Sequence, residues 1–146
     1  MVGIYSYFVY CMTQIRQISV PDNNFGFLQK VNLVQSLLCC LYLESNPLEP
    51  GVFTMRLKFP DGYTISPHTH PNVEHVTVLS GNFLLGKGEN MDKANTERLE
   101  AGSYTSMPPE MIHFVFIEGE TVVQLTSVGP WEINYVNLEQ DDPRLR

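Results

Sequence analysis

GYTISPHTHPNVEHVTVLSG, residues 62–81, is the stretch that decides the fold of this chain. Within it one residue separates His68 from His70, and three residues separate His70 from Glu74. In an extended chain, side chains two apart share a face, so these three even-numbered residues can project together while His75 points the other way. Imidazole and carboxylate groups together suit a divalent first-row metal, and His113 from a second strand of a closed sheet can complete such a site.

The residues on either side of this stretch carry strand signals. From 52 to 59 the side chains alternate, with Phe53, Met55, Leu57 and Phe59 apolar and Thr54, Arg56 and Lys58 polar, which predicts a half-buried strand whose apolar set faces inward. Further short apolar runs lie at 73–79, 82–85, 104–107, 111–117, 121–128 and 131–136. Many short strands without a long amphipathic helix predict an all-β, antiparallel sandwich or barrel.

Two segments are harder to interpret. Residues 31–43 fit both a strand and a helical face, and the local pattern does not decide between them. Residues 86–102 hold most of the local charge, and we expect an exposed connection there with one helical turn around 94–99.

The length and the charge limit the possible functions. A chain of 146 residues has room for about one domain. Nine basic against sixteen acidic side chains give a net charge of −7, which argues against nucleic-acid binding because such binding needs clustered Lys and Arg. The three cysteines, Cys11, Cys39 and Cys40, lack metal-site or redox spacing. We therefore expect small buried side chains in a reducing, cytoplasmic setting.

The first twelve residues are apolar but lack the basic opening of a secretory signal and are too short to cross a bilayer, which takes about 20 apolar residues. Two interpretations stay open for them. They form either an arm or extra strand that needs a partner surface, or an addition upstream of a protein that starts at Met12.

The spacing of residues 62–81 resembles the first signature motif of the cupin superfamily at every fixed position, namely Gly62, His68, His70, Glu74 and Gly81. The second signature is similar to GSYTSMPPEMIHFVFI, residues 102–117, through Gly102, Pro108 and His113. Glu110 stands where this motif has Gly and Ile117 where it has Asn, and neither change removes a metal ligand. The first change puts a side chain at a turn that often needs a positive φ.

The resemblance implies a fold, a metal and a partner. It implies a double-stranded β-helix, a jelly-roll-type barrel, over 52–136 of a single 1–146 domain, with 1–51 as an amino-terminal arm and extra strands. It also implies one divalent transition metal (Fe, Mn, Ni, Co or Zn) held by His68, His70, Glu74 and His113. The tail GPWEINYVN followed by DDPR resembles the ending of small stand-alone bacterial cupins, and such proteins pair into homodimers. The apolar stretches 4–12 and 31–43 could supply that contact.

The ligand set is similar to that of cupin dioxygenases and oxidative decarboxylases, in which Glu74 would act as the proton acceptor. An alternative is a non-enzymatic cupin that senses a ligand or uses its metal for structure, and a third is a barrel without metal.

The side chains predicted to face the barrel interior are mostly apolar. Met111, Val115 and Ile117 share the parity of His113, whereas Ile112, Phe114 and Phe116 face the other way. Such a lumen suits a hydrophobic substrate with one metal-chelating group, unless these side chains simply fill the barrel. Packing is the expected role of the aromatic residues near turns, with a place beside the pocket as the alternative, for Tyr63, Tyr104 and Trp131.

Overall fold

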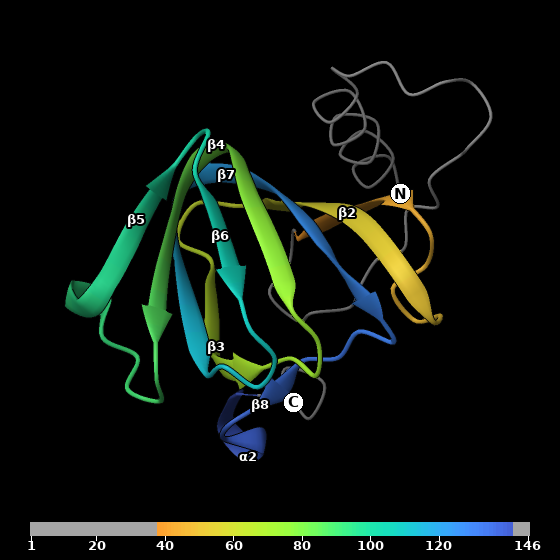
Figure 1. Ribbon diagram of the computed structural model, residues 1–146. Coiled ribbons are helices and arrows are strands. Elements are labelled where there is room, and N and C mark those ends of the chain that lie inside the picture. Colours follow the sequence, from red (N-terminus) through yellow and green to blue (C-terminus); the bar gives the residue numbers. More distant parts are fainter. Residues whose placement is uncertain (1–37, 142–146) are drawn as a thin grey trace, which may run out of the picture.

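The computed structural model describes residues 38–141, and these are built almost entirely of strands (Figure 1). The strands are β1 (Cys39–Glu44), β2 (Gly51–Phe59), β3 (Thr64–Thr69), β4 (Glu74–Lys87), β5 (Thr96–Glu100), β6 (Tyr104–Met107), β7 (His113–Gly129) and β8 (Asn134–Tyr135). A 3₁₀ turn, η1 (Lys93–Asn95), and a short helix, α2 (Leu138–Asp141), complete the elements. All strand pairs are antiparallel, so the predicted all-β class is confirmed.

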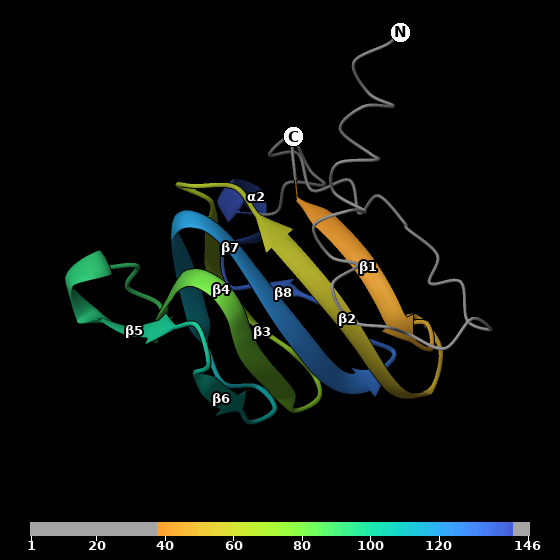
Figure 2. The same ribbon diagram turned by 90° about the horizontal axis from the view of Figure 1, so that it is seen from above.

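Two long strands, β4 and β7, pair with each other and with most of the other strands. β7 pairs along its second half with β2 and along its first half with β3, while its other edge pairs with β4. β1 extends the sheet beyond β2, β8 extends it beyond β3, and β5 and β6 pair with β4. Figure 2 shows β1, β2, β7 and β4 side by side in one curved surface. Because β7 serves both halves, the curvature folds the strands around a common interior.

Gly81, the last glycine of the first motif, marks an irregularity in β4. The pairing register shifts on both sides of Ser80, and Gly81 has a φ of +79°. A Cβ at this position would collide with Thr121 and with the backbone of Glu120 in β7. Thr121 is buried, and its hydroxyl accepts a hydrogen bond from the Asn82 amide at 3.0 Å. The glycine therefore lets the two longest strands, which pair with each other, approach closely at the irregularity in β4.

The alternation predicted for β2 is confirmed. Its apolar side chains are buried in the central cluster, while Arg56 and Lys58 lie on the opposite face. These two cations are nevertheless buried, at 8% and 7% exposure. The Arg56 Nε donates to Gln124 at 3.2 Å, and Lys58 forms an ion pair with Glu120 at 2.9 Å. Both cations are therefore engaged away from the barrel interior.

The interpretation of 86–102 is wrong in part. Residues 96–100 form β5, which pairs with residues 82–86 of β4, and the helical turn lies earlier, at 93–95. Leu99 is the buried residue of this strand and lies opposite Phe83. An edge strand with one apolar residue among charged neighbours lacks the period of two on which the prediction relied.

The strand boundaries also differ from the prediction. The runs 73–79 and 82–85 are one strand, β4, and the runs 111–117 and 121–128 are one strand, β7. β3 was not predicted, because its polar residues and Pro67 do not give the apolar run that indicates a strand. Residues 39–43 are strand, and 31–37 lie outside the described part, as do Cys11 and the stretch 1–12.

The close approach of β4 and β7 at Gly81 predicts that two glycine substitutions lower the free energy of unfolding by very different amounts. Gly81→Ala adds a collision to an unfavourable φ, whereas Gly102, at φ +91°, has no atom within 4 Å of an added Cβ. Urea unfolding should show a loss of about 1 to 2 kcal/mol for Gly102→Ala and above about 3 kcal/mol for Gly81→Ala. Equal losses of unfolding free energy in the two variants would contradict the close approach of β4 and β7 at Gly81.

Candidate metal centre

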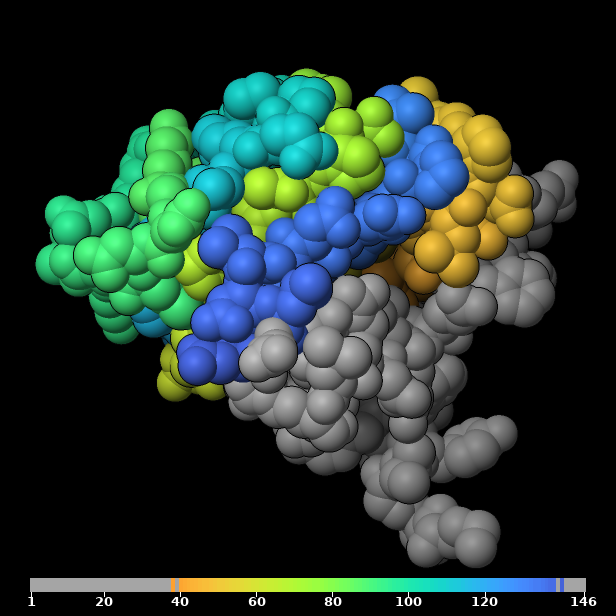
Figure 3. Space-filling view, turned by 90° about the horizontal axis from the view of Figure 1, so that it is seen from below, coloured from red at the N-terminus to blue at the C-terminus, as the bar shows by residue number. Residues whose placement is uncertain are grey.

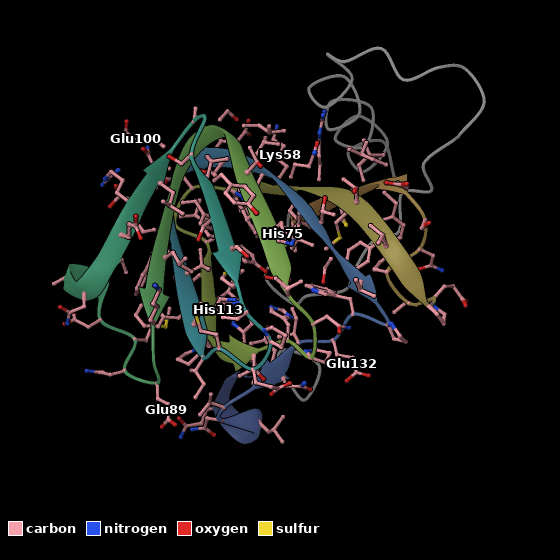
Figure 4. The ribbon with its side chains drawn as sticks, viewed as in Figure 1. Lys58, His75, Glu89, Glu100, His113 and Glu132 are labelled. Atoms are coloured by element: carbon pink, nitrogen blue, oxygen red, sulfur yellow. The ribbon has the colours of Figure 1, made fainter. Side chains whose placement is uncertain are left out.

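The four predicted ligands meet inside the barrel, at the ends of three strands. His68 lies in β3, and His70 follows that strand. Glu74 begins β4, and His113, labelled in Figure 4, begins β7. His68 and His113 are direct partners across the sheet. Each of the four side chains belongs to a residue that is at most 3% exposed. Residues 45 positions apart in the sequence are thus brought to one buried point.

The three imidazoles are oriented by backbone carbonyls. The Nδ1 atom lies 2.7 Å from the Ser66 oxygen in His68, 2.6 Å from that of Glu132 in His70, and 2.9 Å from that of Met111 in His113. A carbonyl oxygen only accepts, so each Nδ1 carries the hydrogen and each Nε2 keeps a lone pair. This tautomer is the one that a metal needs when it binds through Nε2.

These imidazoles, called the His cluster below, could hold a metal ion. One ring nitrogen from each of His68, His70 and His113 lies within 4.8 Å of the others. The ring centroids are 4.2 to 5.3 Å apart. Three neutral nitrogen donors that converge in this way suit a divalent transition metal.

Glu74 supplies an oxygen beside the His cluster. Its Oε2 lies 3.3 Å from the Nε2 of His70 and 3.9 Å from that of His113. Its Oε1 accepts a hydrogen bond of 2.6 Å from the indole nitrogen of Trp131, and the indole ring stacks on His70 at 5.1 Å between centroids. Trp131 therefore fixes one carboxylate oxygen and leaves the other facing the imidazoles.

Burial sets the protonation of the site. Desolvation lowers the pKa of His68 to about 2, with the neighbouring imidazoles adding to the shift, and lowers the pKa of His70 to about 4. The pKa of His113 is lowered for the same reason, and burial raises the pKa of Glu74 to about 7. At neutral pH the imidazoles are neutral donors, and Glu74 is the group that exchanges a proton.

The two departures from the second motif have different structural roles. Glu110 has a φ of +60°, its amide donates to the His70 carbonyl at 2.9 Å, and its side chain accepts from Thr69 at 3.3 Å. The turn does use a positive φ, as the motif suggested, and Glu110 occupies it despite the side chain. Ile117 is buried in the core and exchanges backbone hydrogen bonds with residues 62 and 63.

The aromatic residues separate into pocket and surface. Trp131 and Tyr63 line the interior, and Tyr63 packs on Phe59 at 5.3 Å between centroids. Tyr104 is exposed, and its hydroxyl lies 2.6 Å from the Nδ1 of His75, on the face away from the His cluster. His75 is therefore outside the cluster, as its parity predicted. The three orienting carbonyls were missed, because every residue has a carbonyl and no side chain marks these.

The segment that follows β7 crosses the underside of the barrel, in blue in Figure 3. Within it Trp131 contacts Glu74, and the backbone of Glu132 holds His70. A cavity of about 460 Å³ lies next to the His cluster, and its walls are mainly apolar. The side chains of residues 38–141 thus leave a cavity beside the site and do not fill it. Cys40 is one of the buried wall residues, and burial raises the pKa of its thiol to about 12.

Comparison with solved structures identifies the fold. A polyketide cyclase, RemF from Streptomyces resistomycificus, is similar over 87% of this chain and 91% of its own, with a TM-score of 0.65 and 16% identity. An RmlC-like cupin from Shewanella frigidimarina is similar over 77% and 89%, with a TM-score of 0.57 and 16% identity. The chain has the cupin fold.

Two further likenesses have higher identity and cover less. Oxalate oxidase, also solved with the substrate analogue glycolate, is 30% identical over 60% of this chain and 47% of its own chain, with a TM-score of 0.50. A putative germin-like protein 9-2 from Oryza sativa subsp. japonica is 33% identical over 75 residues, 50% of this chain and 35% of that protein. This chain therefore spans about a third to a half of the length of these two proteins. No protein-family model matches the chain.

The protonation of the site predicts how metal binding depends on pH. At pH 6 the metal-free protein should release about one proton when it binds Zn²⁺, because Glu74 is protonated below its pKa of about 7 and the imidazoles are already neutral. At pH 8 the share of the release that comes from Glu74, measured as the difference between the original protein and Glu74→Gln, should be close to zero. Titration calorimetry in two buffers of different ionisation enthalpy measures this number.

Glu74→Gln is the matched control, since its amide has no proton to lose and the release at pH 6 should vanish. A release of two or three protons by the original protein at pH 6 would show that the imidazoles are charged, against the burial argument.

Proposed function

We propose that this cupin binds one divalent transition metal through His68, His70, His113 and Glu74. The observation that carries the proposal is the set of three buried imidazoles with one ring nitrogen each within 4.8 Å of the others, with the Oε2 of Glu74 beside two of them. Each imidazole is preset by a carbonyl at its Nδ1, so binding would need little reorganisation.

We infer further that the protein is an oxygen-using metalloenzyme of dioxygenase-like type that acts on a small molecule. A bound iron or manganese ion would supply Lewis acidity and redox capacity. Once its Oε2 had loosened from the metal, Glu74 would accept a proton from the substrate at that oxygen. Trp131 would hold the other oxygen during that transfer.

The likeness to oxalate oxidase supports an oxidoreductase, although this chain spans only 47% of that protein. The cavity beside the His cluster supports a small-molecule substrate, since its 460 Å³ falls within the usual range for ligand sites, about 300 to 1,000 Å³. The alternative is a cupin in which the metal serves ligand sensing or structure, and the oxygen experiment below separates the two.

The metal proposal predicts the effect of removing one imidazole. His113→Ala should lose most of the metal that purified, metal-replete protein carries, and it should also lose the rise in melting temperature that the metal gives. Elemental analysis and thermal unfolding measure the two effects.

His75→Ala is the control, because the chain has four histidines and His75 is the one that lies outside the His cluster. Equal metal contents in the two variants would contradict the proposed ligand set.

The enzymatic part is tested with an oxygen electrode. Protein loaded with Fe(II) or Mn(II) is mixed with a panel of 2-hydroxy acids, 2-oxo acids and catechols. We expect consumption of oxygen in proportion to enzyme and to one of these compounds, and its loss in Glu74→Gln. Metal-loaded protein that consumes no oxygen with any of them, or that binds zinc with four protein ligands and no water, would favour the non-enzymatic alternative.

The assembly and location predicted from the sequence remain proposals. Among residues 38–141, no helix is long and apolar enough to cross a membrane. β1 is an edge strand within the described part, which leaves a homodimer through this edge open to test. Light scattering after size-exclusion chromatography measures the mass, and a monomer would contradict the proposed dimer.

A further inference from the structure

The cavity has a marked asymmetry in the chemistry of its walls. Its polar end is formed by the His cluster and Glu74, which lie in β3, in the turn after it, and at the starts of β4 and β7. The lining residues from β2 are all apolar, and so are those from the second half of β7: Met55, Leu57, Phe59, Val123 and Leu125.

The pairing register makes this apolar wall continuous. Met55 lies opposite Leu125, which in turn lies opposite Val76 of β4, so three strands place adjacent apolar side chains in one row. Leu57 lies opposite Val123 in the next row. All five side chains are buried in the central cluster. A ligand that extends from the metal along this wall would bury apolar surface with each carbon.

The charges of the residues that line the cavity limit which groups the ligand can carry at the end away from the metal. Among the described lining residues there is no lysine or arginine, and the carboxylates are Glu74 and Glu132. Arg56 and Lys58, the cations nearest in sequence to the wall, lie on the opposite face of β2 and contact Gln124 and Glu120. Glu132 is exposed, so the buried charge is that of a divalent metal and the Glu74 carboxylate, together +1, which one anionic group balances. A second ligand carboxylate would be buried without a cationic partner, and that is costly.

We propose that the ligand of this site is a monoanionic, amphipathic acid whose oxygen head group meets the metal and whose apolar body lies along the wall of β2 and β7. This ligand class rests on the proposed function, since it assumes the metal. A two-carbon dianion such as oxalate fits poorly, because it has a second charge and no apolar body.

The experiment measures the affinity of 2-hydroxy acids for the full chain loaded with Zn²⁺, which does not react with oxygen. Calorimetry is done with glycolate, 2-hydroxybutanoate and 2-hydroxyhexanoate, and with two dianions, oxalate and butylmalonate. Each added methylene should tighten binding by about fourfold. Butylmalonate, which has the same butyl chain as 2-hydroxyhexanoate but a second carboxylate in place of the hydroxyl, should bind at least about tenfold more weakly.

Equal affinities for glycolate and 2-hydroxyhexanoate would overturn the proposal, as would tighter binding of either dianion or no binding of any acid to the zinc-loaded protein. The zinc content is measured first, so that the two proposals fail separately. A chain that takes up no zinc contradicts the proposed function. A chain that holds zinc and shows no gain with chain length contradicts the ligand class alone.

A pair of neighbouring valines places the ligand within the cavity. Val123→Phe adds a ring to the apolar wall, and Val122→Phe adds the same ring on the other face of β7. We expect Val123→Phe to abolish the advantage of 2-hydroxyhexanoate while zinc binding persists, and Val122→Phe to retain that advantage. If the order is reversed, the ligand does not follow this wall. Should Val123→Phe fail to fold, the chain-length series with the original protein still decides the proposal.

Discussion

The structure depends on one constraint: four polar groups are buried together inside an apolar barrel, and each must keep a hydrogen-bond partner. Three backbone carbonyls satisfy the Nδ1 atoms, and one indole N–H satisfies an oxygen of Glu74. Among the described residues, no buried side-chain nitrogen or oxygen lacks a partner. The atoms turned inward are then the Nε2 lone pairs and Oε2, which is the donor set that a transition metal would share.

The fold supplies these partners from segments far apart in the sequence. The Nδ1 of His70 donates a hydrogen bond to the carbonyl of Glu132, 62 residues later. The carbonyl of His70 in turn accepts a hydrogen bond from the amide of Glu110. At Gly81 the paired strands β4 and β7 approach closely at an irregularity of their register, a type of irregularity that bends a strand. Curvature, ligand orientation and cavity are therefore parts of one arrangement, because the strands that begin with Glu74 and His113 are also the two longest strands of the sheet.

The sequence predicted the parts of this arrangement that follow from periodicity and spacing. The alternation of β2 predicted its buried face, and the spacing of His68, His70 and Glu74 predicted that they would lie together. The chain in fact leaves β3 between the two histidines, so the turn, and not one continuous strand, brings them together.

What the sequence could not predict has physical reasons. β5 escaped detection because an edge strand with solvent on most sides needs only one apolar residue, Leu99. The role of Trp131 depends on a contact with Glu74 across 57 positions, which no local pattern encodes. Whether the barrel would be hollow or filled depends on packing around the apolar wall, and residue types alone do not fix packing.

The most direct test of this account is a crystal structure of metal-replete protein with anomalous diffraction at the absorption edge of the metal. We predict a single peak, bound by the Nε2 atoms of the three cluster histidines and by the Oε2 of Glu74 at about 2.0 to 2.2 Å, with Trp131 still bonded to Oε1. A peak elsewhere, ligation through Nδ1, or no peak among these four side chains would contradict it.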